Sequence, residues 1–267
     1  MALSVNTNIM SIGAQRHLSQ TQSHMETAIQ RLSSGLRVNS AKDDAAGLAI
    51  AERMNAQVRG MNVAIRNSND AISLSQVAEG GLQEVGSMLQ RMRELAVQSA
   101  NGSNSANDRA NLNAEFIALD AEVGRIATVT KFNGLAVLGA DAGVFTFQVG
   151  ANENDTLDVT TVAIAATALT IDTDVAASAS ITAIDTAIDV ITTDRASYGA
   201  AQSRFTSAIN NLQIGAENQA AARSRIIDAD FAVETSNMTR AQILSQAGTA
   251  MISQANTLPQ QVLSLLG

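Results

Sequence analysis

The 267-residue sequence contains no cysteine, which excludes disulfides, thiolate metal sites and a cysteine nucleophile. It has a single proline, Pro259, so no proline limits the length of a helix before that position. Aromatic residues make up only 3% of the chain, and tryptophan is absent. Because large aromatic side chains usually fill the thick core of a globular enzyme, this composition favours thin layers of closely packed helices.

Basic residues are missing from residues 132–194, a stretch that carries only acidic charges. Elsewhere the two signs nearly balance, and no basic stripe of the kind that binds nucleic acid is present. The start, "MALSVNTNIM", lacks the charged region and apolar core of a secretory signal peptide. No long uninterrupted apolar run predicts a membrane span. We therefore expect no nucleic-acid or membrane partner, and either a cytosolic location or export without a cleaved signal.

Apolar residues recur at alternating spacings of three and four, which is typical of coiled-coil helices. The pattern covers residues 82–99, 112–126 and 181–212. It also occurs near both chain ends, in Met25, Ile29, Leu32 and Leu36 and in Met251, Ala255, Leu258, Val262 and Leu265. Residues 45–100 have a helical composition throughout and would extend about 80 Å. The sequence predicts a mainly α fold, an elongated coiled-coil rod of long helices; an ordinary helical bundle is the alternative.

The middle of the chain changes from helical to strand periodicity. "VFTFQVGANENDTLDVTTV" alternates apolar and polar residues on both sides of a polar turn, which predicts a β-hairpin within about residues 140–179. Phe145, Phe147 and Val149 would share one face of it. "KFNG" contains an Asn-Gly turn, and helix is expected to resume near Ser180.

Two breaks in helical sequence lie about 35 residues from the two chain ends. In "RLSSGLRVNSAKDDAAG", Gly35 can end a helix in the left-handed conformation. Ser40 with Asp43 matches a capping box, and Asp43 and Asp44 carry the charge that a helix start favours. In "ARSRIIDADFAVETSN", Asp228 and Asp230 are candidate caps.

These breaks predict three parts. They are an N-terminal helix with linker (residues 1–44), a rod (residues 45–222), and a linker with a C-terminal helix (residues 223–267). Neither terminal helix can bury its apolar stripe alone, and a pair of them would still present apolar residues outward. We expect neighbouring copies to order these terminal helices, which form a separate coiled-coil layer. Head-to-tail contacts that do not close into a ring give a filament.

Several long motifs closely resemble bacterial flagellin. They are "RLSSGLRVNSAKDDAAGLAIAERM", "LQRMRELAVQSANGSNSANDR", "FQVGAN", "ARSRIIDADFAVETSNMTRAQILSQAGTAMISQAN" and "LPQQVLSLLG". The resemblance implies a secreted, extracellular subunit of the flagellar filament, exported unfolded by the flagellar type III route. The terminal helices would form the inner layer and residues 45–222 the outer rod. Only about 20 residues separate the hairpin from the next helix, so a minimal flagellin without extra outer domains is expected.

The resemblance also implies partners. They are further copies in a helical homopolymer, an export chaperone that binds the C-terminal helices, hook-associated and cap proteins, and host Toll-like receptor 5. The receptor motif matches "QRMRELAVQ", with Gln90, Arg91, Leu95 and Gln98, plus Glu115 on the next helix. Arg91 and Leu95 are four residues apart and so share a helix face. We expect these residues to pack between subunits in the filament and to be accessible in the monomer.

Nothing in the sequence predicts an enzyme, a cofactor or a metal site. His17 and His24 lack a nearby acidic cluster, and phosphate-binding and hydrolase motifs are absent. The alternative function is a hook–filament junction protein, whose termini should diverge from "RAQILSQAG" and "VLSLL". A chemoreceptor signalling rod would need a membrane span or a hairpin-tip motif, and the sequence shows neither.

Overall fold

The structure is a computed structural model that describes residues 7–266, with side chains described as far as Thr257. The described chain forms five helices and two antiparallel strand pairs. It divides into two compact units. We call residues 1–56 and 218–267 the terminal unit, and residues 57–217 the central unit. The predicted mainly α fold with a small β region is confirmed.

Two of the five helices are unusually long. The helices are α1 (Ile9–Ser34), α2 (Ala45–Ser99), α3 (Ala106–Val129), α4 (Asp174–Ile227) and α5 (Phe231–Leu266). At 1.5 Å per residue, α2 and α4 each extend about 80 Å. No proline interrupts either of them, as the sequence predicts.

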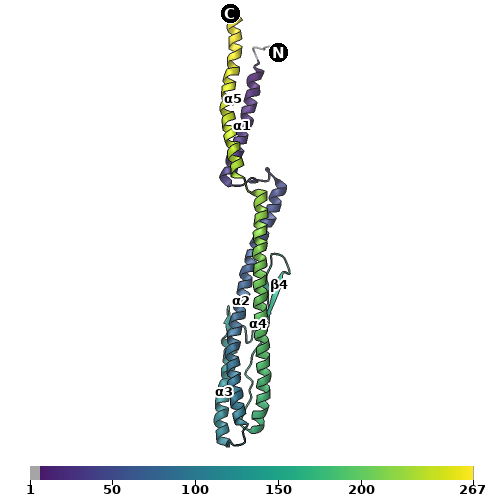
Figure 1. Cartoon of the computed structure of the whole chain (residues 1–267), viewed down its shortest axis with the longest axis vertical. Coiled ribbons are helices and arrows are strands. Elements are labelled where there is room, and N and C mark those ends of the chain that lie inside the picture. Colours follow the sequence, from purple (N-terminus) through teal and green to yellow (C-terminus); the bar gives the residue numbers. More distant parts are fainter. Residues whose placement is uncertain (1–6, 267) are drawn as a thin grey trace. The chain divides into compact units, whose positions relative to one another are not determined.

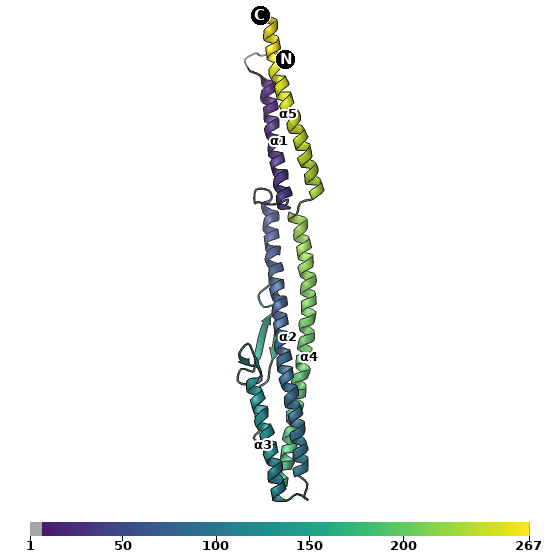
Figure 2. The same ribbon diagram turned by 90° about the vertical axis from the view of Figure 1, so that its left-hand side faces the viewer.

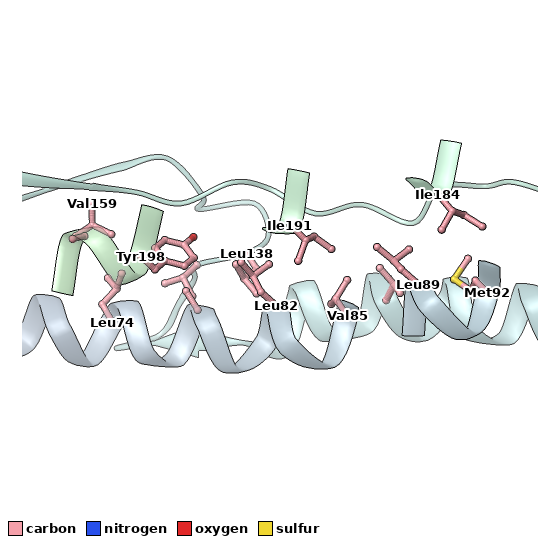
Figure 3. Close-up of a cluster of buried hydrophobic side chains, with 14 of the residues drawn as sticks. Leu74, Leu82, Val85, Leu89, Met92, Leu138, Val159, Ile184, Ile191 and Tyr198 are labelled. Atoms are coloured by element: carbon pink, nitrogen blue, oxygen red, sulfur yellow. The ribbon is translucent and has the colours of Figure 1, made fainter. Parts of the chain in front are cut away.

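The core of the central unit follows the predicted spacing of three and four. The stripe on α2 is at most 2% exposed at each of its positions, namely Leu82, Val85, Leu89, Met92, Ala96 and Ser99. Phe116 of α3 and Ile184 of α4 are fully buried in the same cluster. Figure 3 shows side chains of α2 pointing toward those of α4, with Tyr198 among them. The three helices run side by side in both views (Figures 1 and 2).

The predicted β-hairpin is present as β3 (Val144–Gln148) and β4 (Thr156–Thr160). Phe145 lies opposite Val159, and Phe147 lies opposite Leu157, so their side chains share one face. That face packs on the core, where the Phe147 ring meets the Phe205 ring edge-on at a centroid distance of 5.9 Å.

A second, shorter strand pair contains the predicted Asn-Gly turn. Its strands are β1 (Lys131–Phe132) and β2 (Leu135–Ala136). Asn133 and Gly134 between them have φ values of 50° and 87°. Two successive positive φ values define the tight turn that matches strand twist.

A segment without regular structure, residues 161–173, connects β4 to α4. The Asp120 carboxylate of α3 is only 7% exposed and accepts the backbone N–H of Thr167 at 2.7 Å and of Ala168 at 3.0 Å. Ile171 is fully buried, and its N–H donates to the Asn113 side chain at 2.8 Å. These bonds satisfy the backbone of a segment that has no strand or helix partner.

Helix α4 begins at Asp174, a few residues earlier than the sequence predicts. The Thr173 hydroxyl accepts the N–H of Ala176 at 3.1 Å, as an N-cap residue does. The helix also contains an 18-residue stretch that is long and apolar enough to cross a membrane by composition alone, whereas the sequence predicts no span. Two of the helix's apolar residues, Ile184 and Ile191, are buried in the core, which accounts for part of this composition.

The single tyrosine offers a direct measurement of core integrity. Burial and the neighbouring Asp194 raise the pKa of Tyr198 to about 12, from about 10 in an unfolded chain. Because the raised pKa favours the neutral phenol in the folded state, the contribution of Tyr198 to the free energy of unfolding is fully present below pH 10. It is lost as pH rises from 10 to 12, by on the order of 2–3 kcal/mol.

Ultraviolet absorbance near 295 nm should therefore show a titration midpoint near 12 in native protein and near 10 in urea. Tryptophan is absent, so the signal belongs to Tyr198 alone. Tyr198→Phe should remove both the signal and the alkaline loss of stability. A native midpoint near 10 would contradict the buried position.

Candidate assembly surfaces

The two predicted breaks meet in one joint of the terminal unit. Helix α1 ends at Gly35, which has a φ of 70°, as predicted, and its N–H donates to the Arg31 carbonyl at 2.8 Å. The Ala229 N–H donates to the Gly35 carbonyl at 2.9 Å, and the Arg37 N–H donates to the Ile227 carbonyl at 2.7 Å. A short antiparallel bridge therefore ties the two connections together, about 190 residues apart in sequence.

The predicted capping box at Ser40 is wrong. The Asp43 carboxylate accepts the Ser40 N–H at 2.9 Å and its hydroxyl at 3.0 Å, which lowers the pKa of Asp43, but these residues form a separate turn. Helix α2 begins at Ala45, and Asp44 caps it by accepting the Gly47 N–H at 2.8 Å. Gly47 permits this because a Cβ there would clash with the Asp44 carboxylate.

One of the two candidate caps on the C-terminal side is confirmed. The Asp230 carboxylate accepts the N–H of Ala232 at 2.9 Å and of Val233 at 3.2 Å, so it caps α5. Asp228 is not a cap. It lies in the bridge of the joint, and its carboxylate accepts the Ser224 hydroxyl at 2.6 Å.

Helices α1 and α5 form an antiparallel pair that buries mainly small side chains (Figures 1 and 2). Among the side chains that the structure describes, which end at Thr257 in α5, the buried ones on the two helices are Ser11, Ala28, Glu234, Ala241 and Ala255. Near one end the Asn8 side chain donates to the Ala255 carbonyl at 2.8 Å. Small residues let the two backbones approach closely, but they contribute little apolar area.

An ion pair joins the two helices near the other end of this pair. The Arg31 guanidinium lies 3.0 Å from the Glu234 carboxylate, whose side chain is 8% exposed. Arg31 belongs to the last turn of α1 and Glu234 to the first turn of α5, the helix ends where each charge is favoured. The pair therefore fixes how the two helices align along each other.

The predicted heptad residues of the two terminal helices differ in exposure, and of those with described side chains only Ala255 is buried. Ile29 is 48% exposed and Met251 is 62% exposed, whereas Met25 and Leu32 are half-buried. Leu36 lies beyond the end of α1 and packs in the joint. The remaining predicted residues belong to α5, but their side chains lie outside the described residues; they are Leu258, Val262 and Leu265.

Large apolar side chains are instead exposed on both helices. They are Ile9, Met10, Ile12, Ile29, Phe231, Val233, Ile243, Leu244 and Met251, which are between 48% and 73% exposed. Apolar exposure on this scale marks an interaction surface. The terminal pair thus offers a surface to partners that its own two helices leave uncovered.

The predicted receptor residues are only partly brought together on the surface of the central unit. The Arg91 guanidinium lies 2.8 Å from the Glu115 carboxylate of α3 and 2.9 Å from that of Glu94. These hydrogen bonds raise the pKa of Arg91. Gln90 and Gln98 are also exposed.

The expected exposure of Leu95 is wrong. Its side chain is 1% exposed and belongs to the core cluster. Leu95 lies three residues after Met92 and four before Ser99, so it continues the buried stripe of α2. The spacing of three and four in the sequence therefore already indicated that Leu95 is buried.

Comparison with known proteins identifies the family. A family model described as "Bacterial flagellin N-terminal helical region" matches residues 5–142, and "Bacterial flagellin C-terminal helical region" matches residues 181–266. The chain belongs to the flagellin family. Flagellins are structural proteins, so this flagellin is a filament subunit and not an enzyme. Nothing in the comparisons favours the hook–filament junction alternative.

Individual flagellins match along nearly their whole length. Flagellin of Halalkalibacterium halodurans is 47% identical over 98% of this chain and 99% of that protein. Flagellin of Xenorhabdus nematophila is 42% identical over the full length of both, in an alignment of 312 positions. That alignment exceeds the 267 residues here, so this flagellin lacks residues that its relative has and is a minimal form.

The fold also matches a solved flagellin. The crystal structure of Bacillus cereus flagellin is 33% identical, with a TM-score of 0.52 over 59% of this chain and 94% of that chain.

The sequence patterns did not predict three contacts in this flagellin. They are the Arg31–Glu234 ion pair, the Asn8–Ala255 hydrogen bond and the Asp120 carboxylate that orders the segment after β4. The Arg31–Glu234 ion pair could have been predicted from the opposite charges at the two facing helix ends. The other two join residues far apart in sequence, which no local pattern pairs.

The left-handed glycine in the joint predicts an unequal response to two matched substitutions. Neither Gly35 nor Gly13 has an atom within 4 Å of the position that a Cβ would occupy. Gly35→Ala should cost about 1 kcal/mol because of its positive φ. Gly13→Ala, inside α1, should gain about 1 kcal/mol of helix propensity.

Amide hydrogen exchange of Arg37 and Ala229, whose N–H groups donate across the joint, measures the difference. Exchange should become about fivefold faster in Gly35→Ala and no faster in Gly13→Ala. Equal rates in the two variants would mean that backbone strain at Gly35 does not control the joint.

Proposed function

We propose that the terminal helix pair is the part of this flagellin that drives polymerisation. The observation that carries the proposal is the contrast between the small residues that α1 and α5 bury and the large apolar residues that they expose. Burying one large apolar side chain contributes about 1.5–3 kcal/mol. Covering the nine exposed side chains of the pair with neighbouring copies would therefore supply free energy toward the association cost of about 4–15 kcal/mol.

In this proposal residues 1–44 and 223–267 form the inner layer of an extracellular filament, and residues 45–222 form the outer rod. The central unit supports this division because its helices bury their large side chains against one another. The central unit therefore depends less on contacts with neighbouring copies than the terminal helix pair does. The joint at Gly35 and Ala229 lies where the two layers would meet.

Electron microscopy of purified protein grown from filament seeds tests the proposal. The full chain should polymerise, whereas a chain lacking residues 1–34 and 231–267 should stay monomeric yet helical by circular dichroism. The point variant Ile243→Asp, which charges an exposed position, should keep its helicity and lose polymerisation. Filaments from the truncated chain would show that the central unit drives assembly.

We also propose that the exposed Arg91–Glu115 pair contributes to binding Toll-like receptor 5 when the protein is monomeric. Arg91 and Glu115 are each about half exposed, so a partner can reach both. Leu95 would act only through packing, because its side chain is buried. The exposed residues Gln90 and Gln98 would lie at the margin of this contact.

Receptor activation by monomeric protein in reporter cells tests this second proposal. Arg91→Ala should reduce potency by about 10- to 30-fold, the loss typical of an energetically important interface residue. Arg93→Ala is a matched control, since Arg93 is a similarly exposed arginine of α2 that pairs with Asp185 at 2.6 Å. Equal potency of the two variants would contradict the assignment.

The remaining partners implied by the family are an export chaperone and the hook-associated and cap proteins. We assign the chaperone contact to α5, whose exposed apolar residues include Phe231, Ile243 and Leu244. The same residues would be covered in the filament. Chaperone binding and polymerisation would therefore exclude each other.

A further inference from the structure

The charges of the terminal helix pair do not all find partners within one chain. Helices α1 and α5 contain two carboxylates, Glu26 and Glu234. Glu234 is paired with Arg31. Within the part of the chain that the structure describes, no ion pair forms to Glu26, or to Arg240, the one basic residue of α5. Glu26, Arg240 and also Arg16 of α1 therefore have no ion pair in the described part of the chain and are available to another molecule.

Glu26 lies on the side of α1 that faces away from α5. It is two residues from Ala28, which is buried against α5, and two residues correspond to a rotation of about 200° around a helix. Glu26 and the exposed Ile29 line a shallow hollow of about 440 Å³. The other residues of this hollow are Gln30, Ser33, Ser34 and Asn39. We call it the acidic hollow.

Arg240 lies at the edge of a second hollow, an open and shallow stretch of the α5 surface. Phe231, Ile243 and Leu244 line it and are 68%, 61% and 52% exposed. Its polar lining comes from small hydroxyl side chains, including Thr235 and Thr239. We call it the basic hollow, because Arg240 is its one charged residue.

The two hollows carry opposite charges and share the same residue spacing. In the acidic hollow a carboxylate precedes an exposed isoleucine by three residues, and in the basic hollow a guanidinium precedes an isoleucine by the same interval. Residues three apart on a helix are surface neighbours, so each hollow presents one charge directly beside apolar surface. Within one chain the two hollows do not meet, because Glu26 faces away from α5.

We propose that the acidic hollow of one copy docks on the basic hollow of a second copy. Glu26 pairs with Arg240 of the neighbour, and Ile29 packs against the apolar lining around Ile243. This inference rests on the proposed polymerisation through the terminal pair and specifies one of its contacts. The contact joins different surfaces of the two copies, and such head-to-tail contacts continue into a filament when they do not close.

The ion pair would set the alignment of neighbouring copies. The apolar side chains supply area but tolerate sliding along a helix, whereas an ion pair flanked by apolar groups holds one position and rejects like charges. Arg16 of α1 is also without an ion pair among the described residues, but it lines neither hollow. Of the two unpaired bases on the terminal helices, only Arg240 lies beside the apolar lining of a hollow, and it is therefore the proposed partner.

Charge reversal of the full-length protein tests the contact, with the critical concentration for growth from wild-type seeds as the readout. Glu26→Arg and Arg240→Glu should each raise it at least tenfold. An equimolar mixture of the two variants, and the double variant, should return to within about threefold of wild type. Arg16→Glu makes the same charge change as Arg240→Glu at a residue outside both hollows, and should change the value less than threefold.

The outcomes separate this contact from the proposed function. If the wild type polymerises and the single variants match it, or if neither the mixture nor the double variant recovers, the Glu26–Arg240 contact is overturned while the polymerisation proposal stands. If the wild type itself fails to extend seeds, the polymerisation proposal fails first. Circular dichroism of each variant should match wild type, since both side chains are exposed and unpaired in the monomer.

Discussion

The structure depends on how little the two terminal helices can bury against each other. α1 and α5 meet through Ala28, Ala241 and Ala255, and two polar contacts near the ends hold them antiparallel. Small side chains bring helices close but remove little apolar surface from water. The large apolar residues of both helices are consequently exposed, and covering them requires other molecules. A subunit built in this way presents apolar surface that the proposed assembly would cover.

The central unit is also built from long helices, but it buries its large apolar side chains instead of exposing them. Its three helices place large side chains on facing stripes, so Leu89, Met92 and Phe116 are buried without any partner molecule. The hairpin adds Phe147 and Val159 to this core. The following segment is held by the Asp120 carboxylate. A self-sufficient unit and a partner-dependent one are thus joined in a single chain.

The joint in the terminal unit is held together because the two breaks support each other. Gly35 turns the chain without steric cost, and its carbonyl accepts a hydrogen bond from Ala229. Asp44 and Asp230 then restart helices on the two connections. Neither break contains a helix or strand of its own. Their bridge satisfies backbone groups that would otherwise need water.

The sequence by itself determined the features that depend on local chemistry. The long helices, the left-handed end at Gly35, the hairpin and the buried stripe of α2 all follow from residue spacing and turn residues, and all are confirmed. On the two terminal helices, tertiary structure alone decided which apolar residues are covered. A spacing of three and four identifies a stripe, but not which of two adjacent faces meets the partner helix. Ile29 is therefore exposed while Met25 and Leu32 of the same predicted stripe are half-buried, because Ala28 faces α5 and Ile29 lies about 100° further around the helix.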